Sequence, residues 1–414
     1  MEKHNIVIIG GGPAGMAAAV AAYDRGARDI VILDRDAHLG GILQQCIHNG
    51  FGLHKLGREL TGPEYAAVYE EMVAKRSISV YYETMVTDLT PDRIITAQNR
   101  NGILKIQAEA VILAMGCRER SRGALNICGD RPAGIYSAGT AQKLINCQGY
   151  LVGKKVVILG SGDIGLIMAR RLSLEGAKVE AVCELMPYSG GLTRNIVQCL
   201  EDFSIPLHLS TTVARIHGTG RLEGVTIAQV DENRQIKPET SRYIPCDTLL
   251  LSVGLIPENE LTRNAGIAMD AVTGGARVDD RCQTSVPGIF ACGNVLHVHD
   301  LVDYVSEEAE RAGIAAAERV LGEESTGTFT LTRPGCGVRY VLPQRICTQR
   351  DGALFLRVSE PKSNVRLVVR SGGREIAVFK RRKVAPGEME KLPLRAGMLA
   401  GCREEITVSV EDVQ

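Results

Sequence analysis

Two glycine sets, each followed by an acidic residue, carry the strongest chemical signal in this chain of 414 residues. Residues 5–34 and residues 155–184 each contain a short β-branched run, the pattern G-x-G-x-x-G, an apolar helical stretch and a second apolar run. Each copy ends in an acid that lies 24 positions after the opening glycine. This repeat predicts two sites that each bind a dinucleotide.

Binding the diphosphate of a dinucleotide requires these residue types. In the first copy, Gly10 permits a tight turn, Gly12 lets the backbone approach the pyrophosphate, and Gly15 lets helix and strand pack closely. N–H groups at the helix start favour the anion, and the acid accepts hydrogen bonds from the adenosine ribose. A glycine-rich structural turn is the alternative for one copy, but two copies in one register favour nucleotide binding. The expected contacts are Gly10, Gly12, Pro13, Ala14, Gly15, Asp34 and Arg35, and then Gly160, Gly162, Asp163, Ile164, Gly165 and Glu184.

Glu184 also bears on which nicotinamide nucleotide the second copy binds. Its carboxylate repels a 2′-phosphate, and residues 185–188 (LMPY) offer no arginine to bind one. Arg194 is the only nearby cation. We therefore expect NAD(H) rather than NADP(H).

Composition narrows the class of partner. Lys+Arg and Asp+Glu both total 48, so no basic field attracts nucleic acid or an anionic membrane. The apolar segment 6–20 is interrupted by three glycines and Pro13, which favours strand, turn and helix over a membrane span. We expect a cytoplasmic protein with no nucleic-acid partner and no membrane span.

Three further segments carry a resemblance to a known family. They are residues 40–66 (GGILQQCIHNGFGLHKLGRELTGPEYA), 112–142 and 288–305. With the glycine motifs, they make the chain similar to FAD/NAD-linked reductases related to glutathione reductase. Within that superfamily it resembles the flavoprotein subunits beside anaerobic glycerol-3-phosphate dehydrogenases and the alpha subunits of opine oxidase, dye-linked proline dehydrogenase and cyanide synthase. The resemblance implies an α/β protein with two Rossmann-like domains that hold FAD and NAD(H).

The resemblance implies further cofactor contacts. In such proteins a backbone position like Val86 binds adenine, a strand end closes over the flavin, a Gly-Asp pair binds the ribityl chain, and a helix start faces the flavin N1/C2 edge. The matching residues here are Gly41, Ile42, Val86, Ala114, Met115, Gly116, Gly254, Gly293, Asn294, Leu301 and Val302.

Three departures from the family pattern limit the chemistry. The family's ribityl-binding Asp is Asn294 here, and a Glu often found near the nicotinamide is Ile167. The region after Gly40 lacks the redox-active cysteine pair, so we expect no dithiol–disulfide chemistry.

Cys46 and His48 are the catalytic candidates, because they lie where the family covers the flavin. Cys46 is either a peroxidase-like thiol or a wall contact, and the lack of a suitably spaced resolving thiol favours the wall contact. His48 is either a proton donor to the flavin or a hydrogen-bonded structural residue, and both interpretations stay open.

Other polar groups have structural interpretations. His297 and His299 lack a third metal ligand in sequence, so we expect a solvated loop and no metal site. The apolar period of residues 301–321 predicts a helix, which Asp300 or Asp303 is expected to cap. Most of the 12 cysteines, such as Cys183, are expected to be small buried hydrophobes.

The predicted organisation places one nucleotide-binding fold inside the other. Residues 1–150 and 247–321 form the FAD domain, residues 151–246 form the NAD(H) domain, residues 322–327 form a linker, and residues 328–414 form a small antiparallel, sandwich-like β domain. The basic run 380–383 is expected to be a solvated strand edge, with docking to a partner as the alternative.

These features together predict an FAD-dependent oxidoreductase that exchanges hydride with NAD(H). The resemblance implies electron transfer to or from a partner subunit of glycerol-3-phosphate, amine or amino-acid dehydrogenase type, or a small redox protein. Two alternatives remain: a stand-alone NADH oxidase or peroxidase, and a non-catalytic nucleotide-binding subunit, to which Ile167 lends some support.

Overall fold

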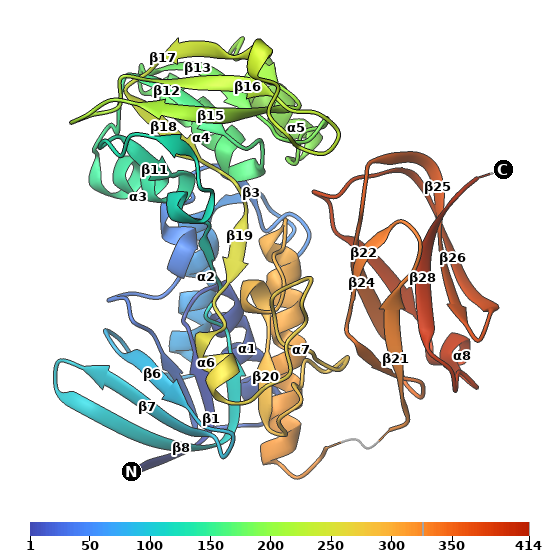
Figure 1. Cartoon of the computed structure of the whole chain (residues 1–414). Helices are drawn as coiled ribbons and strands as arrows, with labels where there is room; N and C mark the ends of the chain where they lie inside the picture. The colour runs from blue at the N-terminus through green and yellow to red at the C-terminus, as the bar shows by residue number, and fades with distance from the viewer. Residues whose placement is uncertain (325–326, 414) are drawn as a thin grey trace. The chain divides into compact units, whose positions relative to one another are not determined.

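The computed structural model describes residues 1–324 and 327–413 (Figure 1). Its internal contacts divide the chain into two compact units. Unit 1 comprises Met1–Gln44, Asn49–Cys117 and Pro257–Gln414, and unit 2 comprises Gln45–His48 and Arg118–Ile256. Strands β9 (Cys117–Glu119) and β19 (Leu255–Pro257) pair with each other where the chain leaves one unit for the other. Unit 2 thus takes in residues 118–150, which lie before the predicted start of the NAD(H) domain.

Unit 1 contains a mainly parallel sheet with the order β5-β2-β1-β8-β7-β6, and β20 pairs with the end of β8. The second half of β1, residues 6–9, and the whole of β2 are apolar and buried, as expected for a sheet covered on both faces. The strands are β1 (Glu2–Ile9), β2 (Ile30–Leu33), β5 (Ser79–Tyr81), β6 (Met85–Leu89), β7 (Ile94–Asn99), β8 (Gly102–Leu113) and β20 (Ile289–Ala291), with the small pair β3 (Asn49–Phe51) and β4 (Leu60–Thr61) beside it in sequence.

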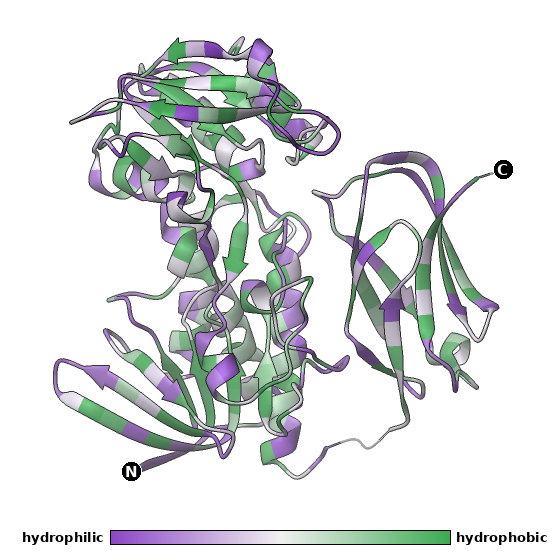
Figure 2. Ribbon diagram, in the orientation of Figure 1, coloured by the Kyte–Doolittle hydropathy of each residue, from purple (hydrophilic) through white to green (hydrophobic). Residues whose placement is uncertain are grey.

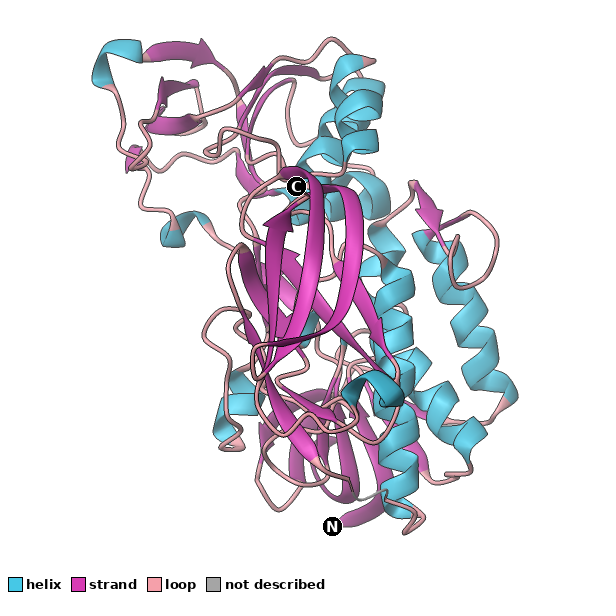
Figure 3. Cartoon of the chain, turned by 90° about the vertical axis from the view of Figure 1, so that its right-hand side faces the viewer, coloured by secondary structure: helices cyan, strands magenta, loops and turns pink. Residues whose placement is uncertain are grey.

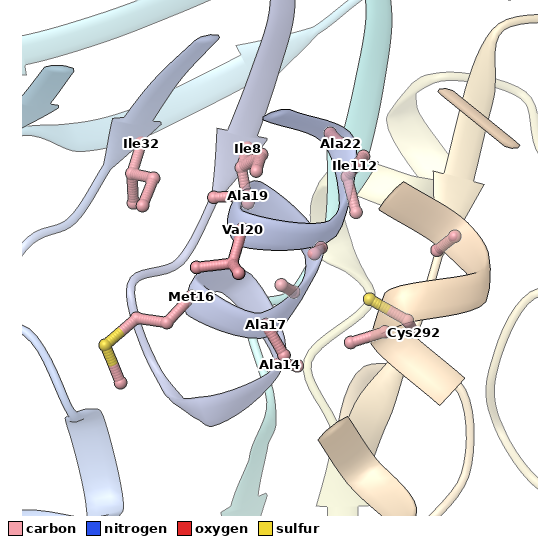
Figure 4. Close-up of a cluster of buried hydrophobic side chains, with 14 of the residues drawn as sticks. Ile8, Ala14, Met16, Ala17, Ala19, Val20, Ala22, Ile32, Ile112 and Cys292 are labelled. Atoms are coloured by element: carbon pink, nitrogen blue, oxygen red, sulfur yellow. The ribbon is translucent and has the colours of Figure 1, made fainter. Parts of the chain in front are cut away.

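Helices α1 (Pro13–Arg25) and α7 (Val302–Val320) lie side by side in unit 1 (Figure 1). Their contact is close because small residues form it: a Cβ on Gly313 would lie 2.2 Å from the Ala18 carbonyl oxygen. The alanines of α1 pack with Ile8, Ile32 and Ile112 of the sheet (Figure 4). The remaining helical segments are η1 (Gly41–Gln45), α2 (Gly62–Lys75), α6 (Glu260–Asn264), η5 (Gly293–Val295) and α8 (Ala396–Leu399).

Unit 2 repeats the arrangement with a parallel sheet of order β11-β18-β12-β13-β14. Hydrophobic residues run along its inner strands (Figure 2). The strands are β11 (Ile135–Ser137), β12 (Lys155–Leu159), β13 (Lys178–Cys183), β14 (Leu207–His208) and β18 (Thr248–Leu251). A second sheet contains β10 (Cys128–Gly129), β15 (Thr211–His217), β16 (Gly224–Gln229) and β17 (Arg242–Pro245), and the helical segments are η2 (Arg122–Ala124), α3 (Ala138–Gln148), α4 (Asp163–Leu174), α5 (Thr193–Ile196), η3 (Val197–Glu201) and η4 (Pro238–Thr240).

The C-terminal part of unit 1 consists mainly of β-strands (Figure 3). Their buried residues form an apolar core of their own. One sheet has the order β23-β21-β28-β25-β26 and the other β22-β24-β27, and β21 pairs with β28 in parallel while the other pairs are antiparallel. The basic run 380–383 lies on the edge strand β26. The strands are β21 (Phe329–Pro334), β22 (Val338–Leu342), β23 (Arg345–Cys347), β24 (Gly352–Val358), β25 (Lys362–Ser371), β26 (Arg374–Val384), β27 (Glu390–Leu394) and β28 (Ile406–Asp412).

The predicted fold class is confirmed: two Rossmann-like α/β folds and a C-terminal β region. The predicted linker at residues 322–327 includes positions 325–326, which lie outside the described residues. Across residues 1–324 and 327–413, no helix combines the length and apolar character that crossing a bilayer requires.

Candidate functional site

The first glycine set forms a tight turn between β1 and α1. A Cβ on Gly10, whose φ is +105°, would lie 2.5 Å from the Ala114 carbonyl oxygen, and a Cβ on Gly15 would lie 1.8 Å from the Gly10 oxygen. A Cβ on Gly12 would meet no atom within 4 Å, so the helix start is open beside this residue. No acidic residue lies in the first turn of α1 and no side chain caps it, which leaves this helix start suited to an anion.

The acid of the first copy is tied to the same turn. Asp34 Oδ2 accepts the Gly11 N–H at 2.5 Å, and Oδ1 accepts the Asp36 N–H at 2.8 Å. Burial raises the pKa of Asp34, although both hydrogen bonds act to lower it. The Thr84 N–H donates to the Asp34 carbonyl at 2.8 Å, which brings the start of β6, with Val86, next to this acid.

The second copy repeats these two backbone hydrogen bonds. Ser161, in the place of Gly11, donates its N–H to Glu184 Oε2 at 2.9 Å, and Met186 donates its N–H to Oε1 at 2.9 Å. Gly160 has a φ of +98°, and a Cβ there would lie 2.1 Å from the Ser252 oxygen. We call the two turns with their acids the first and second cradle.

The segment at residues 189–195, which runs into α5, is bonded to the second cradle. Asp163, in the first turn of α4, accepts the Leu192 N–H at 2.8 Å and the Asn195 side-chain amide at 2.6 Å through Oδ1. The Ser189 hydroxyl donates to the Ser161 oxygen at 3.2 Å. Sequence reasoning missed this segment, for which the Ser189-Gly190-Gly191 turn was the available signal.

Some of the other predicted FAD contacts lie around the first cradle. The Ala114 N–H donates to the Ile9 oxygen at 2.9 Å, which places the end of β8, with Met115 and Gly116, against the turn. A Cβ on Gly41 would lie 3.2 Å from the Gly12 Cα, and the next side chain, Ile42, is 57% exposed. Arg35 is exposed, and Gly254 belongs to unit 2, where its oxygen accepts the Arg120 N–H. Their roles remain predictions.

The turn Gly293–Asn294 is held firmly. The Gly293 N–H donates to Glu308 Oε1 at 2.7 Å, and Asn294 Oδ1 accepts the His299 N–H at 3.0 Å. The next helix begins at Val302, and Leu301 occupies its N-cap without a side-chain hydrogen bond.

The expectation that Asp300 or Asp303 caps α7 is wrong. Backbone N–H groups of other segments bind both carboxylates instead. Asp300 accepts the Met389 N–H at 3.2 Å, whereas Asp303 accepts the Lys55 N–H at 2.8 Å and the Gly52 N–H at 3.3 Å.

The expectation of a solvated loop at His297 and His299 is also wrong, because each side chain is only 1% exposed. Tyr340 of β22 covers His297, with its hydroxyl 3.3 Å from Nδ1. Burial lowers the pKa of His297 to about 4. Glu308 supplies the third ligand type missing from the local sequence, and the three ligating groups lie within 4.8 Å of one another.

The catalytic candidates lie in the segment Gln45–His48 of unit 2. Cys46 Sγ lies 3.9 Å from Gln142 Oε1 of α3. Burial and, to a smaller extent, the neighbouring Cys147 raise the pKa of Cys46 to about 12. Burial, followed by the charges of Arg194 and Arg170, lowers the pKa of His48 to about 4. Cys147 was missed because the fold brings it near from a distant part of the sequence.

Comparison with known proteins places these features in a family. Residues 4–318 match the family model described as pyridine nucleotide-disulphide oxidoreductase. The chain is 26% identical to a subunit of alkyl hydroperoxide reductase from Xanthomonas campestris pv. phaseoli, with 79% of this chain and 59% of that protein covered. It is 25% identical to a subunit of opine oxidase from Agrobacterium tumefaciens, with 64% and 55% covered. The chain thus spans less than two thirds of the length of either relative.

Solved structures show the same likeness. Thioredoxin reductase of T. acidophilum has a TM-score of 0.64 and 25% identity, with 77% of this chain and 99% of that chain covered. L-proline dehydrogenase from P. horikoshii has a TM-score of 0.54 and 19% identity, with 78% and 57% covered, and so supports the fold alone.

Proposed function

The chain belongs to the pyridine nucleotide-disulphide oxidoreductase family, and we propose that it exchanges hydride between NAD(H) and FAD and passes electrons to or from a partner dehydrogenase subunit or a small redox protein. The observation that carries this proposal is the repeated cradle, in which an acid fixes the glycine turn by the same two backbone hydrogen bonds in both units. Two such turns suit two dinucleotides.

The residues of the first cradle fit FAD. The open space at Gly12 and the uncapped start of α1 would receive the diphosphate, and Asp34 would accept the ribose hydroxyls. Ala114 and Gly41 border the turn, and Asn294 would bind the ribityl chain. FAD supplies the hydride chemistry, while these residues bind and orient it.

The second cradle suits NAD(H) better than NADP(H). Glu184 is held in place by hydrogen bonds to both oxygens, so its charge stays where the ribose 2′ position is expected. A 2′-phosphate there would face a carboxylate, which opposes its binding. We therefore propose NADH as the better ligand.

The names of the relatives support the proposal of a partner subunit. The alkyl hydroperoxide reductase and opine oxidase relatives are each named as one subunit of an enzyme, and this chain covers little more than half of each. A glycerol-3-phosphate, amine or amino-acid dehydrogenase is the type of partner that we propose. Which of these applies depends on the assembly rather than on the cradles.

Anaerobic titration of the purified, flavin-containing chain with NADH tests the proposal. We expect NADH to bleach the flavin absorbance near equivalence, NADPH to do so only at much higher concentration, and an added dye to reoxidise the flavin quickly. Flavin that NADH does not bleach would support a non-catalytic nucleotide-binding subunit. Rapid and complete reoxidation by oxygen alone would support a stand-alone oxidase.

A further inference from the structure

A buried carboxylate lies behind the turn Gly293–Asn294. Glu308, on α7, has a side chain that is only 4% exposed, and its Oε2 lies 3.0 Å from His297 Nε2. Its Oε1 accepts the Gly293 N–H at 2.7 Å. Removing a charge from water is costly unless the charge is paired and hydrogen-bonded. Glu308 therefore fixes the backbone of this turn, and the hydrogen bonds from Gly293 and His297 compensate its own burial.

His299 fixes the side chain of the same turn. Asn294 Oδ1 accepts the His299 backbone N–H at 3.0 Å and lies 3.3 Å from the ring Nδ1. Asn294 Nδ2 points the other way and donates to Cys117 Sγ at 3.6 Å. Because the oxygen is engaged, the amide of Asn294 presents its N–H groups on the side of Cys117, beyond the end of β8.

The C-terminal β region holds the other side of this loop. The Tyr340 hydroxyl of β22 lies 3.3 Å from His297 Nδ1. Arg357 of β24 donates to the Val298 oxygen at 3.1 Å and pairs with Asp300 at 3.4 Å. The loop between η5 and α7 is thus bonded to Glu308 on one side and to strands of the C-terminal region on the other.

We propose that Glu308, Tyr340 and Arg357 are positioning residues for FAD, which hold the turn Gly293–Asn294 and the start of α7 in the conformation that receives the flavin. The C-terminal β region then supports the flavin site through Tyr340 and Arg357. This inference rests on the proposed function, since it requires FAD in the first cradle.

A metal is the competing explanation for the cluster of His297, His299 and Glu308. The contacts favour hydrogen-bonded support. Both carboxylate oxygens of Glu308 already have partners, and Arg311 Nη2 lies 3.9 Å from Oε2, where its charge opposes a cation.

Three full-length variants test the inference. Tyr340→Phe removes one hydroxyl, Arg357→Gln removes the charge that binds the loop, and Arg381→Gln is the matched control. The control breaks a 2.6 Å pair with Glu390 that lies wholly within the C-terminal β region. The measurements are the FAD dissociation constant of the apoprotein, the visible circular dichroism of the bound flavin, and the unfolding midpoint of the apoprotein.

We expect Tyr340→Phe and Arg357→Gln to raise the FAD dissociation constant several-fold and to alter the flavin dichroism, while the control changes neither. Equal FAD affinity and spectra with only a lower apoprotein midpoint would overturn the inference, because the contacts would then serve domain docking alone. Stoichiometric zinc or iron in the wild-type protein that is lost in a His297→Ala variant would also overturn it. A wild-type chain that binds no FAD would refute the proposed function itself, and the inference with it.

Discussion

The two cradles have the same pattern of backbone hydrogen bonds but differ at the helix start. In the first, Pro13 opens the helix and no acidic residue lies in its first turn. In the second, Asp163 occupies the matching position and is bonded to the segment at residues 189–195. A carboxylate there repels a diphosphate, so the second cradle should bind its nucleotide less tightly than the first.

The last glycine of each motif, Gly15 or Gly165, is packed more tightly in the first cradle than in the second. A Cβ on Gly15 would lie 1.8 Å from a backbone oxygen, whereas a Cβ on Gly165 would find its nearest neighbours at 2.8 Å, one of them the Ser252 Cβ. The first cradle is therefore the less adaptable one. We infer that it suits a permanently bound cofactor, and that the second suits a nucleotide that enters and leaves.

Gly15→Ala should produce the largest effect. Alanine favours a helix over glycine, but here the new methyl group has no space because it would clash with the backbone carbonyl of Gly10. We expect a loss of about 3 kcal/mol in the free energy of unfolding and a protein that purifies without flavin. The flavin-to-protein absorbance ratio and a denaturant titration measure both effects.

Gly165→Ala is the matched variant in the second cradle. It should retain flavin and raise the NADH dissociation constant by about tenfold, because contacts at 2.8 Å with the Gly160 oxygen and the Ser252 Cβ demand a smaller backbone shift than the 1.8 Å contact at Gly15. Loss of flavin from this variant, with flavin retained in Gly15→Ala, would reverse the assignment of the two cradles.

Acid should weaken the unit that contains the second cradle through His48. The pKa of folded His48, about 4, lies below that of an unfolded histidine, so the unfolded chain binds more protons between pH 6.5 and 4. Stability is therefore constant above about pH 7 and falls as the pH decreases through this range, by about 2 kcal/mol at pH 5.

Denaturant titrations at pH 7.5 and pH 5 of the wild type and of His48→Gln measure this difference. The variant should lose less stability in acid than the wild type. Part of the loss should remain, because the pKa of His297 in unit 1 is lowered to about 4 as well. Identical acid losses in the two proteins would contradict burial of a neutral His48.

Replacing the acid of one cradle should weaken the binding of one nucleotide and leave the other nearly unaffected. Glu184→Gln is expected to weaken NADH binding by about 1.5 kcal/mol. It should also reduce the preference for NADH over NADPH, because the variant lacks the carboxylate charge that repels a 2′-phosphate. Asp34→Asn should weaken FAD binding by a similar amount and leave NADH affinity nearly unchanged. Titration of each variant with both nucleotides checks this. An unchanged ratio of NADH to NADPH affinity in Glu184→Gln would refute the proposed role of Glu184.

Local patterns explain why the cradles could be predicted. Each cradle is a continuous segment in which strand, glycine turn, helix and acid lie within one stretch of chain, and steric rules assign a task to each glycine. The helix after Asn294 was predicted for the same reason, since its apolar period is continuous from residue 301 to 321.

Long-range contacts explain what could not be predicted. His297 and His299 looked solvated because the local sequence does not reveal their tertiary partners. These are Glu308, inside the following helix α7, and Tyr340, in a strand of the C-terminal region. Asp300 looked like a helix cap because nothing nearby indicates that Met389 supplies a backbone N–H to it. Capping rules describe neighbours in sequence, whereas burial of a polar group depends on tertiary partners.

Cys46 should give the smallest effect. With a pKa of about 12, roughly one Cys46 in ten thousand or fewer is a thiolate at pH 7.5, so an alkylating reagent should label the exposed Cys128, Cys147 and Cys336 first. Cys46→Ser should leave FAD content and the rate of flavin reduction by NADH unchanged, as expected for a wall contact. Peptide mass spectrometry after timed alkylation checks the order of labelling. If Cys46 were labelled as fast as Cys147, or if the serine variant lost turnover, Cys46 would be the peroxidase-like thiol, with Cys147 as the nearby second thiol that the sequence pattern did not reveal.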